Sequence, residues 1–214
     1  MKKTVLLTIV MTVVLALALS IGVFATEEAT TEAAADDTTT IGAVEQTEQA
    51  PKLLSLVFNG GSLAIIGAAL AVGLAGIGSA KGVGMAGEAT SGLLSENPNL
   101  FGKAFVLMAL PMTQGIYGLV IAFLIVLRAG LFDGGMEAVL SLSVKQGAYY
   151  LMAALPIAAV GLISALKQAR VAVAGINLLS KRPDQVGKAI TSAALVETYA
   201  LFALLISVLL VLLG

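Results

Sequence analysis

Residues 93–104 (LLSENPNLFGKA) and residues 178–189 (LLSKRPDQVGKA) are two versions of one polar turn with matching flanks. Continued toward the N-terminus, the same register pairs Ser79 with Ser164, together with other small residues. A proline-containing turn alone is a common feature of proteins. Shared flanks, with small residues in register on the preceding stretch, indicate a duplication. The repeated unit is a helical hairpin, and the chain contains it twice.

Long apolar stretches surround both turns, at about 56–80, 101–127, 146–170 and 189–213. Each is close to or above the length that crosses roughly 30 Å of hydrocarbon. At that length only helices satisfy their own backbone in lipid. Of the 214 residues 58% are hydrophobic and 12% are charged, and the charged fraction is about half that of a soluble domain. We therefore predict an all-α membrane protein built from two duplicated transmembrane hairpins.

The missing residue types exclude several functions. The chain has no Cys, no His and no Trp, which excludes disulfides, thiol nucleophiles, imidazole bases and Cys/His zinc sites. The net charge of −1 argues against a nucleic-acid partner, which requires a basic surface. Any chemistry must use carboxylates, amides, hydroxyls or a few basic residues.

The N-terminal part differs from the rest. Lys2 and Lys3 precede an apolar run that ends at Phe24. This order is typical of a secretory signal peptide, and the length of the run also allows an uncleaved signal anchor, so residues 1–25 are assigned to one of the two. Residues 26–54 are acidic and contain few large apolar residues, which predicts a flexible extracytoplasmic segment.

We predict the first hairpin at 55–130, an extracytoplasmic loop at 131–145 and the second hairpin at 146–214. The connection between the third and fourth spans is rich in Lys and Arg, whereas the segment before the first span is acidic. The positive-inside rule then predicts cytoplasmic hairpin turns and extracytoplasmic termini in the cell membrane.

Small residues are concentrated on the first helix of each hairpin, with nine glycines between residues 60 and 87. In lipid, helices associate by close backbone approach, so small residues mark contact faces. Two interpretations remain open at this point. The contacts belong either to tight packing within a four-helix monomer or to the inner wall of a ring of hairpins.

Glu197 is the only carboxylate deep within a predicted span. Insertion of an acid there costs about 2.5–3.5 kcal/mol. Either Glu197 is neutralised by a structural hydrogen bond or it forms an ion or proton site. The site hypothesis requires polar partners at the same depth in the bilayer.

Four polar residues lie at one depth. Gln168 and Glu197 are fifteen and fourteen residues from the turn proline Pro183, and Thr113 and Gln114 lie at a matching distance from the other turn proline. At 1.5 Å per residue, all four are roughly 20 Å from the turns. They are expected to converge.

Further residues join the predicted site. Tyr117 is three residues beyond Gln114 and shares its helix face. Pro111 interrupts the helical hydrogen-bond ladder, which can expose a carbonyl near Leu110. Oxygen ligands of this kind suit a hard cation such as Na⁺, and the carboxylate of Glu197 is equally able to carry a proton.

The repeat places Met112 opposite Glu197 and Val83 opposite Gln168. Only one hairpin has the carboxylate, so the two halves are predicted to share one site.

The motifs at 76–82 (GIGSAKG), 110–118 (LPMTQGIYG) and 195–200 (LVETYA) resemble those of a known family. It is the duplicated proteolipid, or membrane-ring subunit K (also called c), of bacterial and archaeal V-type ATPases. The resemblance extends over roughly 55–214. It implies a four-helix proteolipid that is part of a rotor ring, transports ions and does not itself catalyse a reaction.

The resemblance also implies a ligand set and the transported ion. Sodium-binding members of the family use a Leu carbonyl, a Thr, two Gln and a Glu, with a Tyr hydrogen-bonded to the Glu. The matching residues are Leu110 (backbone), Thr113, Gln114, Gln168, Glu197 and Tyr117. Retention of the full set favours Na⁺ over H⁺, with no other cofactor.

The partners implied are identical ring subunits, a stator subunit of the a/I type, and central-stalk subunits at the turns 95–100 and 180–186. Nucleotide hydrolysis belongs to other subunits, because the chain has no phosphate-binding loop. Two alternatives are a free-standing small cation transporter or channel and a tetraspan scaffold without transport. A transporter would be expected to contain inverted repeats, whereas this repeat is parallel.

Overall fold

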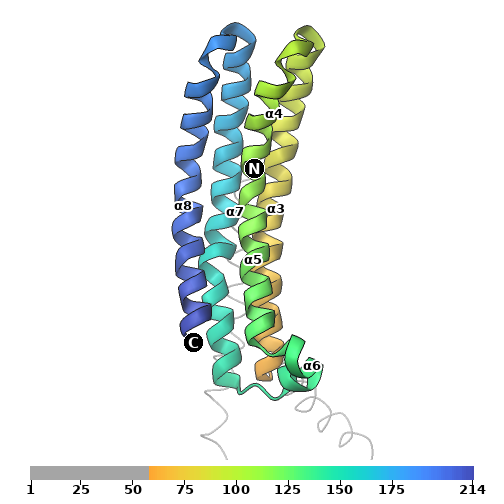
Figure 1. Ribbon diagram of the computed structural model, residues 1–214, viewed down its shortest axis with the longest axis vertical. Coiled ribbons are helices and arrows are strands. Elements are labelled where there is room, and N and C mark those ends of the chain that lie inside the picture. Colours follow the sequence, from red (N-terminus) through yellow and green to blue (C-terminus); the bar gives the residue numbers. More distant parts are fainter. Residues whose placement is uncertain (1–57) are drawn as a thin grey trace, which may run out of the picture. The chain divides into compact units, whose positions relative to one another are not determined.

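The computed structural model describes residues 58–214. The predicted signal segment (1–25), the acidic segment (26–54) and the first residues of the first hairpin lie outside the described residues. Four helical stretches between residues 58 and 214 are long and apolar enough to cross a membrane: Gly60–Glu96, Pro98–Arg128, Val144–Lys181 and Pro183–Leu213. The prediction of four spans in two hairpins is confirmed (Figure 1).

The elements follow the duplication. The first hairpin consists of α3 (Gly60–Glu96), η1 (Pro98–Leu100), α4 (Phe101–Ala109), η2 (Leu110–Met112) and α5 (Thr113–Arg128). The second consists of α7 (Val144–Lys181), η3 (Pro183–Gln185) and α8 (Val186–Leu213). Both hairpin turns lie at one end of the bundle, and the connecting helix α6 (Leu131–Leu140) lies at the other end (Figure 1).

The two hairpin turns have the same backbone geometry. The residue before each turn proline is Asn97 (φ −135°, ψ 75°) in the first hairpin and Arg182 (φ −143°, ψ 79°) in the second. In both cases its N–H donates to the carbonyl four residues earlier, and the proline then begins a short 3₁₀ turn. Lys103 Nζ also donates to the carbonyl of Pro183 at 2.9 Å, which links the two turns. The sequence repeat is therefore a structural repeat.

The first helix of each hairpin is longer than the predicted apolar span. The spans were predicted to end near 80 and 170, whereas α3 and α7 have 37 and 38 residues and continue to Glu96 and Lys181. At 1.5 Å per residue both are roughly 55 Å long, well above the roughly 30 Å of hydrocarbon. Charged residues end an apolar stretch but do not end a helix. The helices end only where the turn prolines stop them.

The segment predicted as a loop at 131–145 contains the ten-residue helix α6. Gly130, at its N-cap, has φ 83°, and Gly135 interrupts the helix with φ 63° and ψ −151°. Both positive φ values are accessible to glycine without steric cost. The connection is therefore a short, glycine-bounded helix.

The small residues of the first hairpin allow α3 to pack against α7. A Cβ on Gly78 would lie 2.7 Å from the carbonyl oxygen of Leu162, so only glycine allows this approach. By contrast, a Cβ on three other glycines of α3 would meet nothing within 4 Å: Gly73, Gly76 and Gly84. Packing within the chain explains only part of the small-residue pattern.

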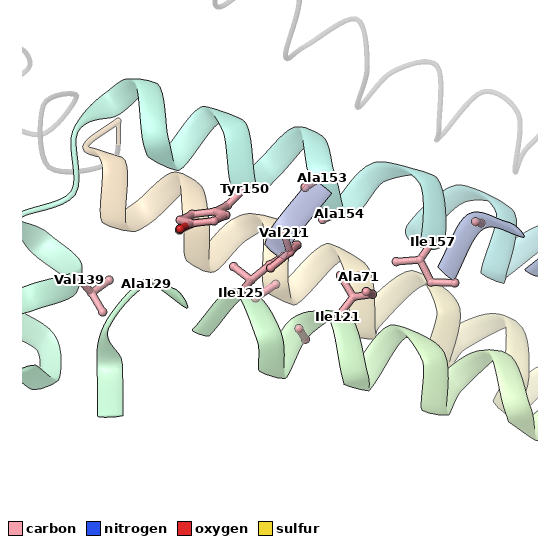
Figure 2. Packing of buried hydrophobic residues seen from close by; sticks show 14 residues of the cluster. Ala71, Ile121, Ile125, Ala129, Val139, Tyr150, Ala153, Ala154, Ile157 and Val211 are labelled. Atoms are coloured by element: carbon pink, nitrogen blue, oxygen red, sulfur yellow. The ribbon is translucent and has the colours of Figure 1, made fainter. Parts of the chain in front are cut away.

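The buried apolar residues form two clusters along the bundle. The cluster nearer α6 includes Ile121 and Ile125 of α5 and Ile157 of α7 (Figure 2). The cluster nearer the turns includes Leu107 of α4 and Ile176 of α7. On α5, α7 and α8, the polar residues predicted to form the site lie in sequence between the residues of the two clusters.

Hydrogen bonds tie the helices together on the α6 side of the polar layer. Arg128, at the end of α5, donates to the carbonyls of Val211 (3.3 Å) and Leu212 (2.5 Å), which lie in the last turn of α8. Ser207 Oγ of α8 accepts from the N–H of Ile157 on α7 at 3.3 Å. The three helices that carry the polar residues are thus held in register.

Candidate ion-binding site

Glu197 lies near the middle of α8 and is half-buried. Tyr117, on α5, donates its hydroxyl hydrogen to Glu197 Oε1 over 2.6 Å. Gln168, on α7, donates from Nε2 to Glu197 Oε2 over 3.5 Å, and also to the carbonyl of Ala193 at 3.2 Å. The carboxylate therefore receives side chains from both hairpins.

The amide side chains of Gln114 and Gln168 form the buried centre of the site. Both are fully buried, and Gln114 Nε2 donates to Gln168 Oε1 at 2.6 Å. A buried amide without a partner would cost free energy, so this pair fixes the orientation of both side chains. The bond joins α5 to α7 and thus connects the two hairpins.

Thr113 completes the network on the side of the first hairpin. Its hydroxyl donates to the carbonyl of Leu110 at 2.9 Å and lies 3.4 Å from Gln114 Oε1. The six residues predicted from the sequence are thus joined in one hydrogen-bonded network: Leu110, Thr113, Gln114, Gln168, Glu197 and Tyr117. None of the six lies apart from the others.

Pro111 breaks the helix as expected. The 3₁₀ turn η2 separates α4 from α5 around it, and the N-cap of α5, Met112, makes no capping hydrogen bond through its side chain. The carbonyl of Leu110 faces Thr113, whose backbone N–H and hydroxyl both donate to it. The break therefore directs a backbone oxygen and a hydroxyl into the same region.

The chemistry of the site follows from its donor atoms. The oxygen atoms gathered here come from one carboxylate, two amides, one hydroxyl and one carbonyl, a set that suits a hard monovalent or divalent cation. In the described part of the chain no three His, Cys, Asp or Glu residues are grouped to hold a metal ion. With a single negative charge, the set fits a monovalent cation better than a divalent one.

The hydrogen-bond partners of Glu197 are a phenol and an amide, which carry no charge. An ionised carboxylate held only by neutral groups in a membrane retains most of its desolvation cost. A bound cation or a proton removes that cost. The arrangement can therefore bind and release a single positive charge.

Two contacts of the site were not predicted from the sequence. One is the carbonyl of Ala193, which accepts from Gln168. The other is Ser79 on α3, which hydrogen-bonds to both sides of the residue pair Thr113 and Gln114. The pairing of Ser79 with Ser164 was visible in the repeat, but a serine among small residues carries no signal for a contact with another helix.

Comparison with known proteins is consistent with this geometry. The model of the family of the C-type subunit of ATP synthase matches the chain twice, at residues 66–125 and 151–210. The two matches are offset by 85 residues (151 − 66), which is the offset of the two turns (178 − 93). Each match covers one hairpin.

Two curated proteins are similar to the chain. The V-type sodium ATPase subunit K of Enterococcus hirae is 49% identical over 155 residues, which cover 72% of this chain and 94% of that protein. The A-type ATP synthase subunit K of Methanocaldococcus jannaschii is 37% identical over 154 residues, covering 69% of this chain and 61% of that protein.

Proposed function

This chain belongs to the family of the C-type subunit of ATP synthase, as a duplicated K-type rotor proteolipid of V- and A-type ATPases, and we propose that it carries Na⁺ on Glu197. As a member it is a non-catalytic, multi-pass membrane subunit of a rotary ion-translocating ATPase. The parallel order of its two matched hairpins argues against the alternative of a free-standing transporter with inverted repeats.

One observation carries the proposal for Glu197. Tyr117 donates to its carboxylate at 2.6 Å, and Gln168, Gln114 and Thr113 continue the network from there. Every member has an oxygen atom, and the only charge is that of Glu197. A sodium ion would be held by Glu197, Gln168, Gln114, Thr113 and the carbonyl of Leu110, with Tyr117 orienting the carboxylate.

The relative from Enterococcus hirae supports sodium as the transported ion, because it is a subunit of a sodium ATPase and is 49% identical to this chain. A single negative charge neutralised by a monovalent cation leaves a site that can face lipid. If sodium does not bind, the same carboxylate is the natural carrier of a proton.

The proposed mechanism is rotation of a ring of identical chains against a stator subunit of the a/I type. Glu197 takes up an ion from one half-channel, travels through the lipid in the neutral state and releases the ion where a stator arginine displaces it. Each charge that crosses is worth about 2.3 kcal/mol per 100 mV, so several crossings are coupled to each ATP.

Glycines of α3 support the ring. A Cβ on Gly73, Gly76 or Gly84 would meet no atom of the chain within 4 Å, which leaves room for close approach of a neighbouring copy. The turns at 95–100 and 180–186 are proposed to contact the central stalk on the cytoplasmic side. With one carboxylate per two hairpins, the ring moves fewer ions per turn, which suits an ATP-driven pump.

A labelling experiment tests the proposal. In membranes that contain the assembled ATPase, a carboxyl-reactive carbodiimide should modify Glu197, and Na⁺ should prevent the modification. Glu88, which is exposed near the turn end of α3, provides a matched control: Glu88→Gln should leave the labelling intact and Glu197→Gln should abolish it. Labelling that Na⁺ does not reduce at any pH would replace sodium by protons.

A further inference from the structure

The helix α5 begins inside the bundle without a cap of its own. Its N-cap residue is Met112, whose side chain makes no capping hydrogen bond. The first N–H groups of any helix lack intrahelical acceptors, and a Ser, Thr, Asp or Asn at the N-cap usually supplies one to the second or third residue. At a buried helix start the missing acceptor must come from elsewhere.

Ser79 supplies it from another helix. Its Oγ accepts from the N–H of Gly115, the third residue of α5, at 2.7 Å, and donates to the carbonyl of Met112 at 3.3 Å. The bond to Gly115 is the one that an N-cap serine makes, and here it comes from a side chain of α3. Ser79 is only 6% exposed, so water does not compete freely for either bond.

The two bonds enclose the residues proposed as ligands. Thr113 and Gln114 lie between Met112 and Gly115, so both anchors of Ser79 are adjacent to them in the chain. The proline that creates the break also packs closely against α3, because a Cβ on Gly82 would lie 2.8 Å from Pro111 Cβ. The helix that contributes no ligand thus holds the helix that contributes two.

The repeat provides an internal comparison. Ser164, which corresponds to Ser79, donates to the carbonyl of Gly161 in its own helix at 3.3 Å. The outer helix of its hairpin, α8, is continuous from Val186 to Leu213 and has no internal start to cap. The same residue type is therefore used in two ways, and of the two serines Ser79 is the one that bridges two helices at the break.

We propose that Ser79 is a positioning residue of the ion site, which caps α5 in trans and holds Thr113 and Gln114 where they face the cation. The inference rests on the proposed function of this site. Loss of the hydroxyl leaves the start of α5 without its acceptor and releases the two ligands, while the carboxylate of Glu197 on α8 stays in place.

The test uses the carbodiimide assay on the assembled ATPase, with the Na⁺ concentration that halves labelling of Glu197 as the readout. Ser79→Ala should raise this concentration roughly fivefold, the factor that corresponds to loss of one helix-capping side chain. The rate of labelling without Na⁺ should not change. Ser79→Thr, which retains the hydroxyl, should restore the wild-type concentration, and the matched control Ser164→Ala should leave it unaltered.

Each outcome separates the two hypotheses. Absence of Na⁺ protection in the wild type overturns the sodium function and this inference with it. Normal protection in the wild type and an unchanged value in Ser79→Ala overturn this inference alone, as does a threonine variant that assembles but behaves like the alanine variant. If Ser79→Ala does not assemble, Ser79→Cys, with a weak acceptor of similar size, must show the raised concentration.

Discussion

The two hairpins share one backbone turn but differ in their outer helices. In the first hairpin Pro111 divides the outer helix into α4 and α5, and the neutral ligands lie just after the break. In the second, α8 is continuous and carries Glu197. Duplication has allowed one copy to present oxygen atoms from an opened backbone and the other to present the charge.

This division has a physical reason. A helix break in lipid exposes backbone groups, which is tolerated only where other groups satisfy them. The start of α5 is satisfied by Ser79 and by the hydroxyl of Thr113. A carboxylate already costs free energy in a membrane, so it is better placed on an unbroken helix, where its own backbone adds no further cost.

The largest effect is expected from removing the charge that distinguishes the second hairpin. Glu197→Gln keeps the size and hydrogen-bonding capacity of the side chain, so the ring should still assemble. Ion transport and its coupling to ATP hydrolysis should be lost, because no group remains that changes charge. Both are measured as ATP-driven radioactive Na⁺ uptake into membrane vesicles. Uptake at the wild-type rate would disprove the role of Glu197.

An intermediate effect is expected at Tyr117, whose repeat counterpart is Phe202. Tyr117→Phe removes the hydroxyl that donates to Glu197, and hydrogen bonds to charged groups contribute about 1.5–3 kcal/mol. The Na⁺ concentration that half-protects Glu197 from the carbodiimide should rise at least roughly tenfold.

Phe202→Tyr is the control for that experiment, since it adds a hydroxyl at the equivalent position of the other outer helix. Phe202 is exposed on α8, so its added hydroxyl has no carboxylate to orient and the half-protecting concentration should stay at the wild-type value. Equal values for Tyr117→Phe and the wild type would mean that the phenol does not contribute to binding.

The smallest effect is expected at two threonines that the repeat places at corresponding positions. Thr113 and Thr198 both donate to the carbonyl three residues earlier, at 2.9 Å and 2.8 Å. Thr113→Ala removes one neutral ligand and should raise the half-protecting Na⁺ concentration roughly fivefold, as expected for about 1 kcal/mol. Thr198→Ala should have no effect. A larger effect at Thr198 would contradict the assignment of the break as the ligand side.

Much of the fold and of the candidate site follows from the sequence. The four spans are confirmed, and so are the duplicated hairpins. The depth of Gln168, Glu197, Thr113 and Gln114 could be counted from the turn prolines because a helix rises by a constant amount per residue. That count is sufficient to expect the residues at one level.

Other features required the tertiary structure. The count of residues places Gln114 and Gln168 at one level but does not make them a bonded pair, since that depends on how α5 and α7 are rotated about their axes. The length of α3 beyond residue 80 and the helix α6 were also missed, because charge and glycine content describe solubility and turns better than helix ends.

The sequence by itself determined the class of the protein, its duplication and the one acid able to carry an ion, because hydrophobicity, periodicity and charge are properties of the chain alone. The tertiary structure decided which neutral atoms surround that acid, and it decided that Ser79 of a third helix holds the opened start of α5. Such contacts depend on helix rotation and on close approach at glycines. Both are set by the packing of all four helices together.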